Sequence, residues 1–379
     1  MSDAASEVQR LLREDLRGRT AYGAPQLDVP VCLNTNENSY AVPDVVVKAI
    51  LDALEDDIAG LNRYPDREFT ALRGALTAYL EKQAGEAFSV DQLWAGNGSN
   101  EVLSHIVQAF GGFGRTALGF TPSYSMHPII CETLGTRWVD GAREQGTFGL
   151  TVESAAEQAA AHDPSIVFLS SPNNPTGTAL PFDVVTAVLD AAPNAVVVVD
   201  EAYAEFARPG TRSALSLVSG NPRLVVTRTM SKAFAFAGGR LGYLVAAPEF
   251  VDALRLVRLP YHLSTPTQTI ARVALEHADL MLGTVEAIKH QRDRLVHALA
   301  EMGATPLESD SNFVLFGGLV DEKVTWQALL DEGVLVRDVG IPHHLRVTAG
   351  TPEETATFLR AMATLAHTHL SHATGDDTP

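Results

Sequence analysis

The sequence predicts an α/β protein, with a large domain built on a mostly parallel sheet between helices and a smaller α+β domain. Two observations support this prediction. Short, β-branched apolar runs alternate with helical patterns through the middle of the chain. Beyond about residue 260 the pattern changes, and a long helical stretch precedes several short strands. The 379 residues, 46% of them hydrophobic, are enough for the cores of two such domains.

Four runs are expected to form buried strands of the large sheet. Each is apolar on both faces, as in parallel strands that helices cover, and polar or turn residues follow it. The runs are Ile166–Leu169, Ala195–Val199, Leu224–Val226 and Leu241–Val245. Ligands of such sheets bind beyond the carboxyl ends of the strands. Asn174, Asp200 and Lys232 follow three of these runs, so this end of the sheet is where we expect a site.

Lys232 stands out because its surroundings are unusual for a lysine. It follows an apolar run, and no carboxylate lies beside it in Arg228-Thr229-Met230-Ser231-Lys232-Ala233-Phe234. Asn174, Asp200 and Tyr203 precede it in the chain. An amide, an acid, a phenol and a lysine in this order suit a site for pyridoxal 5'-phosphate (PLP). In such a site the lysine forms an imine with the cofactor and the acid faces the pyridine nitrogen.

A glycine-rich turn precedes another expected helix. Gly96-Asn97-Gly98-Ser99-Asn100-Glu101 leads into apolar residues that recur at helical spacing from Val102 to Phe110. Such a helix N-terminus presents free backbone N–H groups to an anion. A helix capped by Ser99 or Asn100, with no ligand, explains the same residues. This segment alone leaves both interpretations open.

The domain boundaries follow from these patterns. Residues 1–40 are expected to form an N-terminal arm that joins the small domain or reaches a partner subunit. Residues 41–262 would form the large, PLP-binding domain, residues 263–370 the small domain, and residues 371–379 a disordered tail. In the small domain we expect a helical stretch over about residues 266–302 and strands at 312–316, 334–337 and 345–348.

The composition argues against several classes of partner. A formal net charge of −18 does not suit binding to nucleic acid, which needs a basic surface. Cys32 and Cys131 form neither a CxxC motif nor a Cys/His cluster, so no metal is expected. The N-terminus lacks the basic and apolar regions of a signal peptide, and no apolar stretch is long enough for a membrane span. These features together predict a cytoplasmic protein without a membrane partner.

A series of segments, in order across nearly the whole chain, resembles the fold-type-I PLP-dependent aminotransferases of class II. The resemblance is closest to the histidinol-phosphate aminotransferases. The segments are Leu33–Asn38, Arg63–Asp66, Ala95–Glu101, Thr121–Tyr124, Ser171–Gly177, Asp200–Tyr203, Thr229–Phe234, Arg240–Tyr243, Leu335–Asp338 and Leu345–Thr348.

The resemblance implies how the chain would hold PLP. Lys232 would attach the cofactor and then move the substrate proton. Asp200 would pair with the pyridine nitrogen, and Tyr203 and Asn174 with the phenolic oxygen, while Tyr124 would stack on the ring. Lys232, Asp200 and Tyr203 are therefore the expected catalytic residues. The cofactor phosphate would be bound by Gly98, Ser99, Asn100, Ser231 and Arg240, and by Tyr64 from the neighbouring subunit of a homodimer with shared active sites.

The same resemblance assigns substrate binding to Tyr22, Asn174, Arg337 and Arg346. Arg346 would bind the α-carboxylate of an amino-acid or keto-acid substrate, and Arg337 the phosphate of a phosphorylated one. Tyr22 of the arm would cover the pocket. Taken singly, Arg337 could be a charge at a sheet edge, Tyr22 could pack the arm onto the body, and Asp200 could cap the next helix.

The implied reaction is PLP-dependent transamination of L-histidinol phosphate with 2-oxoglutarate. It yields imidazole acetol phosphate and L-glutamate, a step of L-histidine biosynthesis. An aromatic amino acid (phenylalanine) aminotransferase and a threonine-phosphate decarboxylase share these motifs and stay as alternatives. A PLP-sensing transcription regulator would need a DNA-binding domain, for which the short segment before Leu33 and the acidic composition leave no place.

Overall fold

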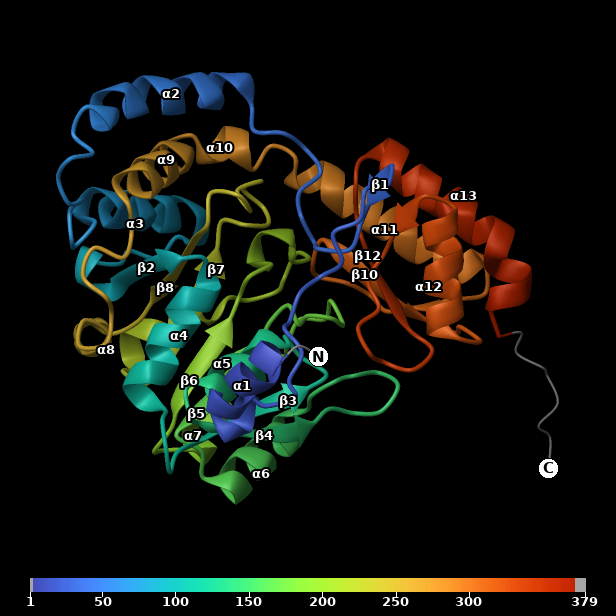
Figure 1. Cartoon of the computed structure of the whole chain (residues 1–379), viewed down its shortest axis with the longest axis horizontal. Helices are drawn as coiled ribbons and strands as arrows, with labels where there is room; N and C mark the ends of the chain where they lie inside the picture. The colour runs from blue at the N-terminus through green and yellow to red at the C-terminus, as the bar shows by residue number, and fades with distance from the viewer. Residues whose placement is uncertain (1–2, 372–379) are drawn as a thin grey trace.

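The computed structural model describes residues 3–371 and confirms the predicted fold class. Figure 1 shows a larger body around the central sheet and a smaller body, mostly orange and red, beside it. We call these the large and the small domain. Apart from Ser371, which donates a backbone hydrogen bond to Gly318, the tail predicted at residues 371–379 lies outside the described residues.

Among the described residues, the large sheet has seven strands in the order β2-β8-β7-β6-β5-β3-β4. β8 runs antiparallel to its neighbours β2 and β7, and the other neighbouring strands are parallel. Only residues 230–240 separate β7 from β8, too few for the helical crossover that a parallel return requires. The strands are β2 (Leu93–Asn97), β3 (Thr116–Thr121), β4 (Arg137–Ala142), β5 (Ile166–Ser170), β6 (Val196–Asp200), β7 (Leu224–Thr229) and β8 (Leu241–Val245).

The four predicted strands correspond to β5, β6, β7 and β8, which are buried along their whole lengths. Helices pack around the sheet and exclude water from both faces, as the apolar runs predict (Figure 1). The α-helices of this part are α2 (Asp44–Ile58), α3 (Thr70–Ala84), α4 (Ser99–Phe110), α5 (Met126–Thr133), α6 (Val152–His162), α7 (Phe182–Ala191), α8 (Pro248–Leu254), α9 (Thr265–Glu276) and α10 (Ala278–Met281), with 3-10 helices η2 (Val90–Gln92), η3 (Ala204–Phe206) and η4 (Ala214–Gly220).

The small domain combines a three-stranded antiparallel sheet, in the order β12-β10-β9, with helices. Its elements are α11 (Val285–Glu301), β9 (Thr305–Pro306), β10 (Phe313–Gly317), α12 (Glu322–Asp331), β11 (Val334–Leu335), β12 (Leu345–Thr348) and α13 (Pro352–His369). A strand from the N-terminal arm, β1 (Val31–Cys32), pairs in parallel with β11. The arm therefore lies against the small domain at this point (Figure 1).

The beginning of the arm lies against the large domain instead. It contains α1 (Asp3–Leu11) and η1 (Glu14–Leu16), which lie beside α5 in Figure 1. Arg13 donates to the carbonyl of Thr133 at 2.9 Å, and Arg19 forms an ion pair with Glu132 at 2.6 Å. The arm thus contacts both domains on the way to β1.

The helical stretch predicted over about residues 266–302 is not one element, and its first part, up to Met281, packs on the large domain rather than within the small domain predicted at residues 263–370. The stretch consists of α9, α10 and α11, with breaks at His277 and at residues 282–284. The second break has a packing reason. Ala278 and Met281 on α10 belong to the core of the large domain, whereas Val285 and Ile288 on α11 belong to that of the small domain. The chain turns between the two cores at Gly283. Glycine disfavours a helix because its backbone is flexible.

Gly242 on β8 is required by a close approach of two elements. It lies opposite Gly96 in the pairing of β8 with β2. A Cβ at Gly242 would overlap the backbone of Gly98 and Ser99, at the turn where β2 leads into α4. The absence of a side chain therefore lets this turn lie directly on the sheet.

We predict that Gly242→Ala lowers the free energy of unfolding by about 1–3 kcal/mol, because the turn or the strand must move to make room for the methyl group. Urea denaturation of the ligand-free protein would measure this loss. Gly220→Ala is the control, since nothing lies within 4 Å of a Cβ there, and it should change the free energy by less than about 0.5 kcal/mol. Equal stabilities of the two variants would contradict the packing argument.

Candidate active site

A cavity of about 820 Å³ lies beyond the carboxyl ends of the parallel strands, between the two domains and the arm. It is lined by most of the residues that the sequence nominated. These are Tyr22, Ser99, Asn100, Tyr124, Asn174, Asp200, Tyr203, Ser231, Lys232, Arg240, Arg337 and Arg346. Gly98 precedes Ser99 and is not itself part of this lining, and Tyr64 does not line the cavity.

Lys232 follows β7, and its Nζ donates to the carbonyl oxygen of Thr35 at 2.9 Å. Burial lowers the pKa of Lys232 to about 8. The charge of Arg346 adds to this shift, Glu37 opposes it, and Arg240 adds to it again. At pH 7 such an amine is neutral about one tenth of the time, against less than about one thousandth for an ordinary lysine. Lys232 can therefore act as a nucleophile or a base near neutral pH.

Asp200 is the last residue of β6 and is only 3% exposed. One of its oxygens, Oδ2, accepts from Nε2 of His127 at 3.1 Å, and Oδ1 accepts from the hydroxyl of Thr227 at 3.1 Å. His127 lies on α5 and stacks on Phe168 with ring centroids 4.7 Å apart. These contacts fix the carboxylate at the floor of the cavity and satisfy part of its hydrogen-bonding capacity, as a buried charge requires.

Tyr203 and Asn174 belong to one hydrogen-bonded network. The phenolic oxygen of Tyr203 accepts from Nδ2 of Asn36 at 3.0 Å and lies 3.5 Å from Nδ2 of Asn174. Arg346 donates to Oδ1 of Asn174 at 2.6 Å and to the carbonyl oxygen of Asn34 at 2.8 Å. Because Tyr203 accepts from both amides, its own proton is free to be donated to a ligand in the cavity.

Two arginines lie next to each other at the side of the cavity formed by the small domain. The backbones of Arg337 and Arg346 form a reciprocal pair of hydrogen bonds, each 2.9 Å long. Burial lowers the pKa of Arg346 to about 10, against the effect of Tyr203, and the charge of Arg337 contributes to the lowering. Nε of Arg346 has no hydrogen-bond partner within residues 3–371. Two neighbouring guanidinium groups with unused donors are suited to bind an anion.

Tyr22 of the arm covers this pair. Its ring centroid lies 5.9 Å from the guanidinium carbon of Arg337, and the side chain is about half exposed. The arm thereby contributes an aromatic wall to the same side of the cavity.

The opposite side is formed by the turn between β2 and α4. Gly98 has a φ of 83°, and a Cβ there would overlap the guanidinium group of Arg240. Arg240 lies 3.5 Å from the hydroxyl of Ser231, and Tyr124 donates to Oδ1 of Asn100 at 3.2 Å. The N-terminus of α4, a guanidinium group and two hydroxyls thus converge on one region. This arrangement makes a cradle for a second anion.

The sequence analysis missed two polar residues that shape the site, His127 and Asn36. Asn36 lies within a recognised segment, but only the structure shows that it binds Tyr203 and accepts from Thr348 at 3.1 Å. His127 is in none of the recognised segments, although it follows Tyr124 closely. An isolated histidine on a helix gives no signal of its own, because its partner Asp200 is distant in the sequence.

The cavity thus combines a nucleophilic amine, a fixed buried carboxylate and two places for anions. Within the described residues no group of three or more His, Cys, Asp or Glu side chains could hold a metal ion. None of the helices in the same part of the chain has the length and hydropathy to cross a membrane.

Comparisons with known proteins fit this geometry. The family described as "Aminotransferase class I and II" matches residues 29–362. The histidinol-phosphate aminotransferase of Paenarthrobacter aurescens is 58% identical over 368 residues, which cover 96% of this chain and 98% of the relative. That of Frankia casuarinae is 56% identical over 354 residues, covering 93% of this chain and 89% of the relative.

A solved structure has the same fold. The histidinol-phosphate aminotransferase of Sinorhizobium meliloti, in complex with pyridoxal-5'-phosphate, superposes with a TM-score of 0.79. The match covers 89% of this chain and 91% of that chain at 23% identity. At this identity the similarity is evidence for the fold alone.

We predict that labelling of Lys232 by trinitrobenzenesulfonate in the ligand-free protein has a midpoint near pH 8. The neutral amine is the reactive form, so labelling rises with pH through the pKa. Arg346→Gln removes a neighbouring cation that disfavours the ammonium form, and it should move the midpoint to higher pH. Glu37→Gln removes an attractive anion and should move it to lower pH. Mass spectrometry would quantify the label, and a midpoint that both substitutions leave in place would contradict the contributions of these two charges to the pKa of Lys232.

Proposed function

Because the chain belongs to the class I and II aminotransferases, and among them to the histidinol-phosphate aminotransferases, we propose that it transfers the amino group of L-histidinol phosphate to 2-oxoglutarate. The products are imidazole acetol phosphate and L-glutamate, and the reaction is a step of L-histidine biosynthesis. The observation that carries the proposal is the neighbouring pair Arg337 and Arg346 in the cavity of Lys232. Such a pair suits one site that accepts a phosphate ester and a dicarboxylate in turn.

The cavity fits pyridoxal 5'-phosphate in its donors and its shape. Lys232 offers an amine with a lowered pKa, Asp200 a buried carboxylate, and the turn at Gly98 a cradle that a Cβ would fill. When bound, PLP withdraws electrons from the carbon that carries the substrate amine, which makes its proton easier to remove.

Lys232 is the residue that moves this proton. Its pKa near 8 lets it accept and return a proton close to neutral pH, and general acid–base catalysis is most effective when the pKa lies near the working pH. Asp200, whose carboxylate is held by His127 and Thr227, would accept a hydrogen bond from the protonated pyridine nitrogen. Tyr203, with its free proton, and Asn174 would bind the phenolic oxygen of the cofactor.

The remaining cofactor contacts position the ring and the phosphate. Tyr124, which lines the cavity, would pack on the ring and exclude water from the reacting atoms. Gly98, Ser99 and Asn100 at the N-terminus of α4 would bind the cofactor phosphate together with Ser231 and Arg240.

Substrate binding falls to the other anion site. Arg346 binds the carboxylate of 2-oxoglutarate or glutamate, since its guanidinium group is held in place by Asn174 and Asn34. Arg337 binds the phosphate of histidinol phosphate, and Tyr22 closes the pocket over it.

We infer that the protein is a homodimer in which Tyr64 binds the cofactor phosphate of the partner subunit. Tyr64 is 79% exposed and lies outside its own cavity. Exposed apolar side chains lie on the preceding helix α2 (Leu51, Ile58) and in the segment between α8 and Tyr261 (Leu256, Leu259). Exposed apolar surface of this kind is typical of a subunit interface.

A cytoplasmic location remains part of the proposal. Cys32 is exposed and Cys131 is buried, and neither is in a disulfide. Free thiols of this kind favour a reducing compartment.

The proposed reaction predicts a higher kcat/KM for histidinol phosphate than for phenylalanine, each measured with 2-oxoglutarate. Lys232→Ala is the control and should lose turnover of both substrates by several orders of magnitude, since no other amine in the cavity can take its role. A preference for phenylalanine would favour an aromatic aminotransferase. Release of CO2 from O-phosphothreonine would favour the decarboxylase.

The role of Arg337 predicts a selective loss. Arg337→Ala should lower kcat/KM for histidinol phosphate by about 10- to 100-fold, the value of one or two hydrogen bonds to a charged group. The value for phenylalanine, which has no phosphate, should change by less than about threefold. Arg337→Lys keeps the charge and should recover part of the loss. Equal losses for the two substrates would deny Arg337 a role in phosphate binding.

A further inference from the structure

The segment between α2 and α3 presents Tyr64 on the surface with a fixed neighbour. The ring of Tyr64 stacks on that of Tyr261, with centroids 4.5 Å apart and an interplanar angle of 12°. Tyr261 has a φ of 61°, in the left-handed region that a bulky residue seldom adopts unless the surroundings impose it. The two aromatic side chains are therefore held in a defined arrangement although both are exposed.

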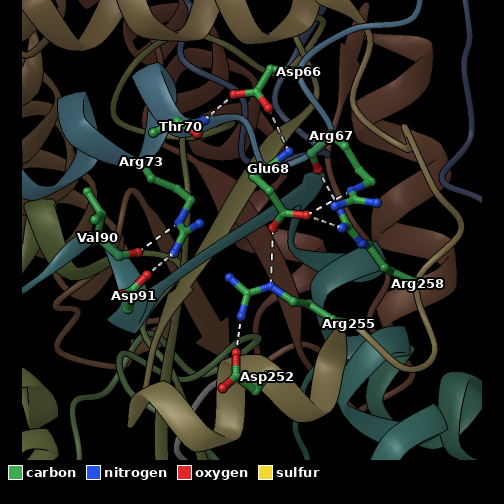
Figure 2. A network of polar contacts seen from close by, with 10 residues as sticks. All are labelled: Asp66, Arg67, Glu68, Thr70, Arg73, Val90, Asp91, Asp252, Arg255 and Arg258. Atoms are coloured by element: carbon green, nitrogen blue, oxygen red, sulfur yellow. Dashed lines mark hydrogen bonds and ion pairs between the residues drawn. The ribbon is translucent and has the colours of Figure 1, made fainter.

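Glu68 joins the two segments that carry these tyrosines, as Figure 2 shows. Its Oε1 accepts from Arg258 at 2.5 Å and its Oε2 accepts from Arg255 at 3.1 Å. Arg258 also donates to the backbone carbonyl of Arg67. Arg255 and Arg258, which precede Tyr261, thus bind the segment that follows Tyr64. Both bind the side chain of Glu68, and Arg258 also binds the backbone.

The opposite charges of Glu68 and of its partners Arg255 and Arg258 stabilise the ion pairs between them. Burial raises the pKa of Glu68, but the hydrogen bonds and charges of Arg258 and then Arg255 outweigh it, so the pKa lies below its usual value. The side chain of Arg258 is only 6% exposed, and its guanidinium carbon lies 5.3 Å from the ring centroid of Trp94. Charge-assisted hydrogen bonds shielded from water are stronger than those of an exposed ion pair.

The segment that carries Tyr261 is in turn bound to the end of β2. Asn97 donates to the carbonyl oxygen of His262 at 2.9 Å, and Nε2 of His262 donates to the carbonyl oxygen of Ala95 at 2.9 Å. On the other segment, Asp66 accepts from the backbone of Glu68 and Thr70 at 2.9 and 2.8 Å (Figure 2). The Glu68 cluster therefore connects Tyr64 to the rigid sheet through contacts on both sides.

We propose that Glu68, through Arg255 and Arg258, is a positioning residue that holds the Tyr64–Tyr261 pair so that the phenol of Tyr64 reaches the cofactor phosphate in the partner subunit. The proposal rests on the proposed function, in which Tyr64 completes the partner's site. A tyrosine on a loose loop would lose conformational entropy each time it bound the phosphate, and a fixed one does not. The cluster thus increases the affinity for PLP without touching it.

The test measures the Kd of PLP for the ligand-free protein by absorbance titration, together with the thermal midpoint of each variant. Glu68→Gln keeps the shape but removes the charge, and it should weaken PLP binding by about tenfold. Tyr64→Phe removes the hydroxyl but keeps the stacked ring, and it should weaken binding at least as much. If Glu68 acts through Tyr64, the double variant binds PLP no more weakly than Tyr64→Phe alone.

Asp252→Asn is the matched control. It removes a carboxylate from the same Arg255 but leaves the bridge to Glu68 in place, so the Kd of PLP should stay within about twofold of the unchanged protein (Figure 2). Sedimentation at the titration concentration would establish that each variant has the oligomeric state of the unchanged protein.

Four outcomes overturn the proposal. Glu68→Gln could lower only the thermal midpoint while Tyr64→Phe weakens PLP binding, and the proposed function would then stand without the positioning role. The losses of the two single variants could add in the double variant, or Glu68→Gln could dissociate the subunits, and Glu68 would then not act through Tyr64. If Tyr64→Phe left the Kd of PLP unchanged, the role of Tyr64 in the proposed function would itself be wrong.

Discussion

The hydrogen bonds of the buried Arg346 guanidinium hold the site together, because they join the parts of the chain that meet at the cavity. Arg346 lies on β12 of the small domain and binds Asn174 of the large domain and the carbonyl oxygen of Asn34 in the arm. The same positive charge contributes to the lowered pKa of Lys232. A single cation thus contributes both to the shape of the cavity and to the reactivity of its amine.

The side chains that line the cavity carry a net positive charge, whereas the chain as a whole is negative. The formal net charge is −18, yet Lys232, Arg240, Arg337 and Arg346 line one cavity together with three carboxylates. Of these carboxylates, Asp200 is bound by His127 and Thr227, and Glu37 accepts from the hydroxyl of Thr35 at 2.9 Å. The remaining positive charge is concentrated at two places, near Arg240 and near Arg346. Such local concentration lets an acidic protein attract small anions, whereas its outer surface repels large ones.

The sequence predicts those features that depend on local composition. The buried strands β5 to β8 were identified because strands covered on both faces are apolar throughout. β3 and β4 were not, because Gly119 and Gly141 interrupt them and much of β4 is partly exposed. His127 was missed for a different reason, since its relation to Asp200 exists only in the folded chain. The break between α10 and α11 likewise depends on which core each helix joins, and helical periodicity contains no such information.

The strand β2 shows how one rigid element can support contacts in two directions. Its carboxyl end leads into the turn at Gly98, where β8 approaches so closely that Gly242 has no room for a side chain. Through Ala95 and Asn97 the same end of β2 binds His262, the residue after Tyr261. The cradle inside the cavity and the exposed tyrosine pair outside it are therefore attached to the same strand. In a homodimer with shared sites, each cofactor phosphate would be bound by groups attached to β2 of both subunits. A rigid β2 would then fix the distance between these groups, provided that the link from His262 to Tyr64 through Arg258 and Glu68 is rigid as well.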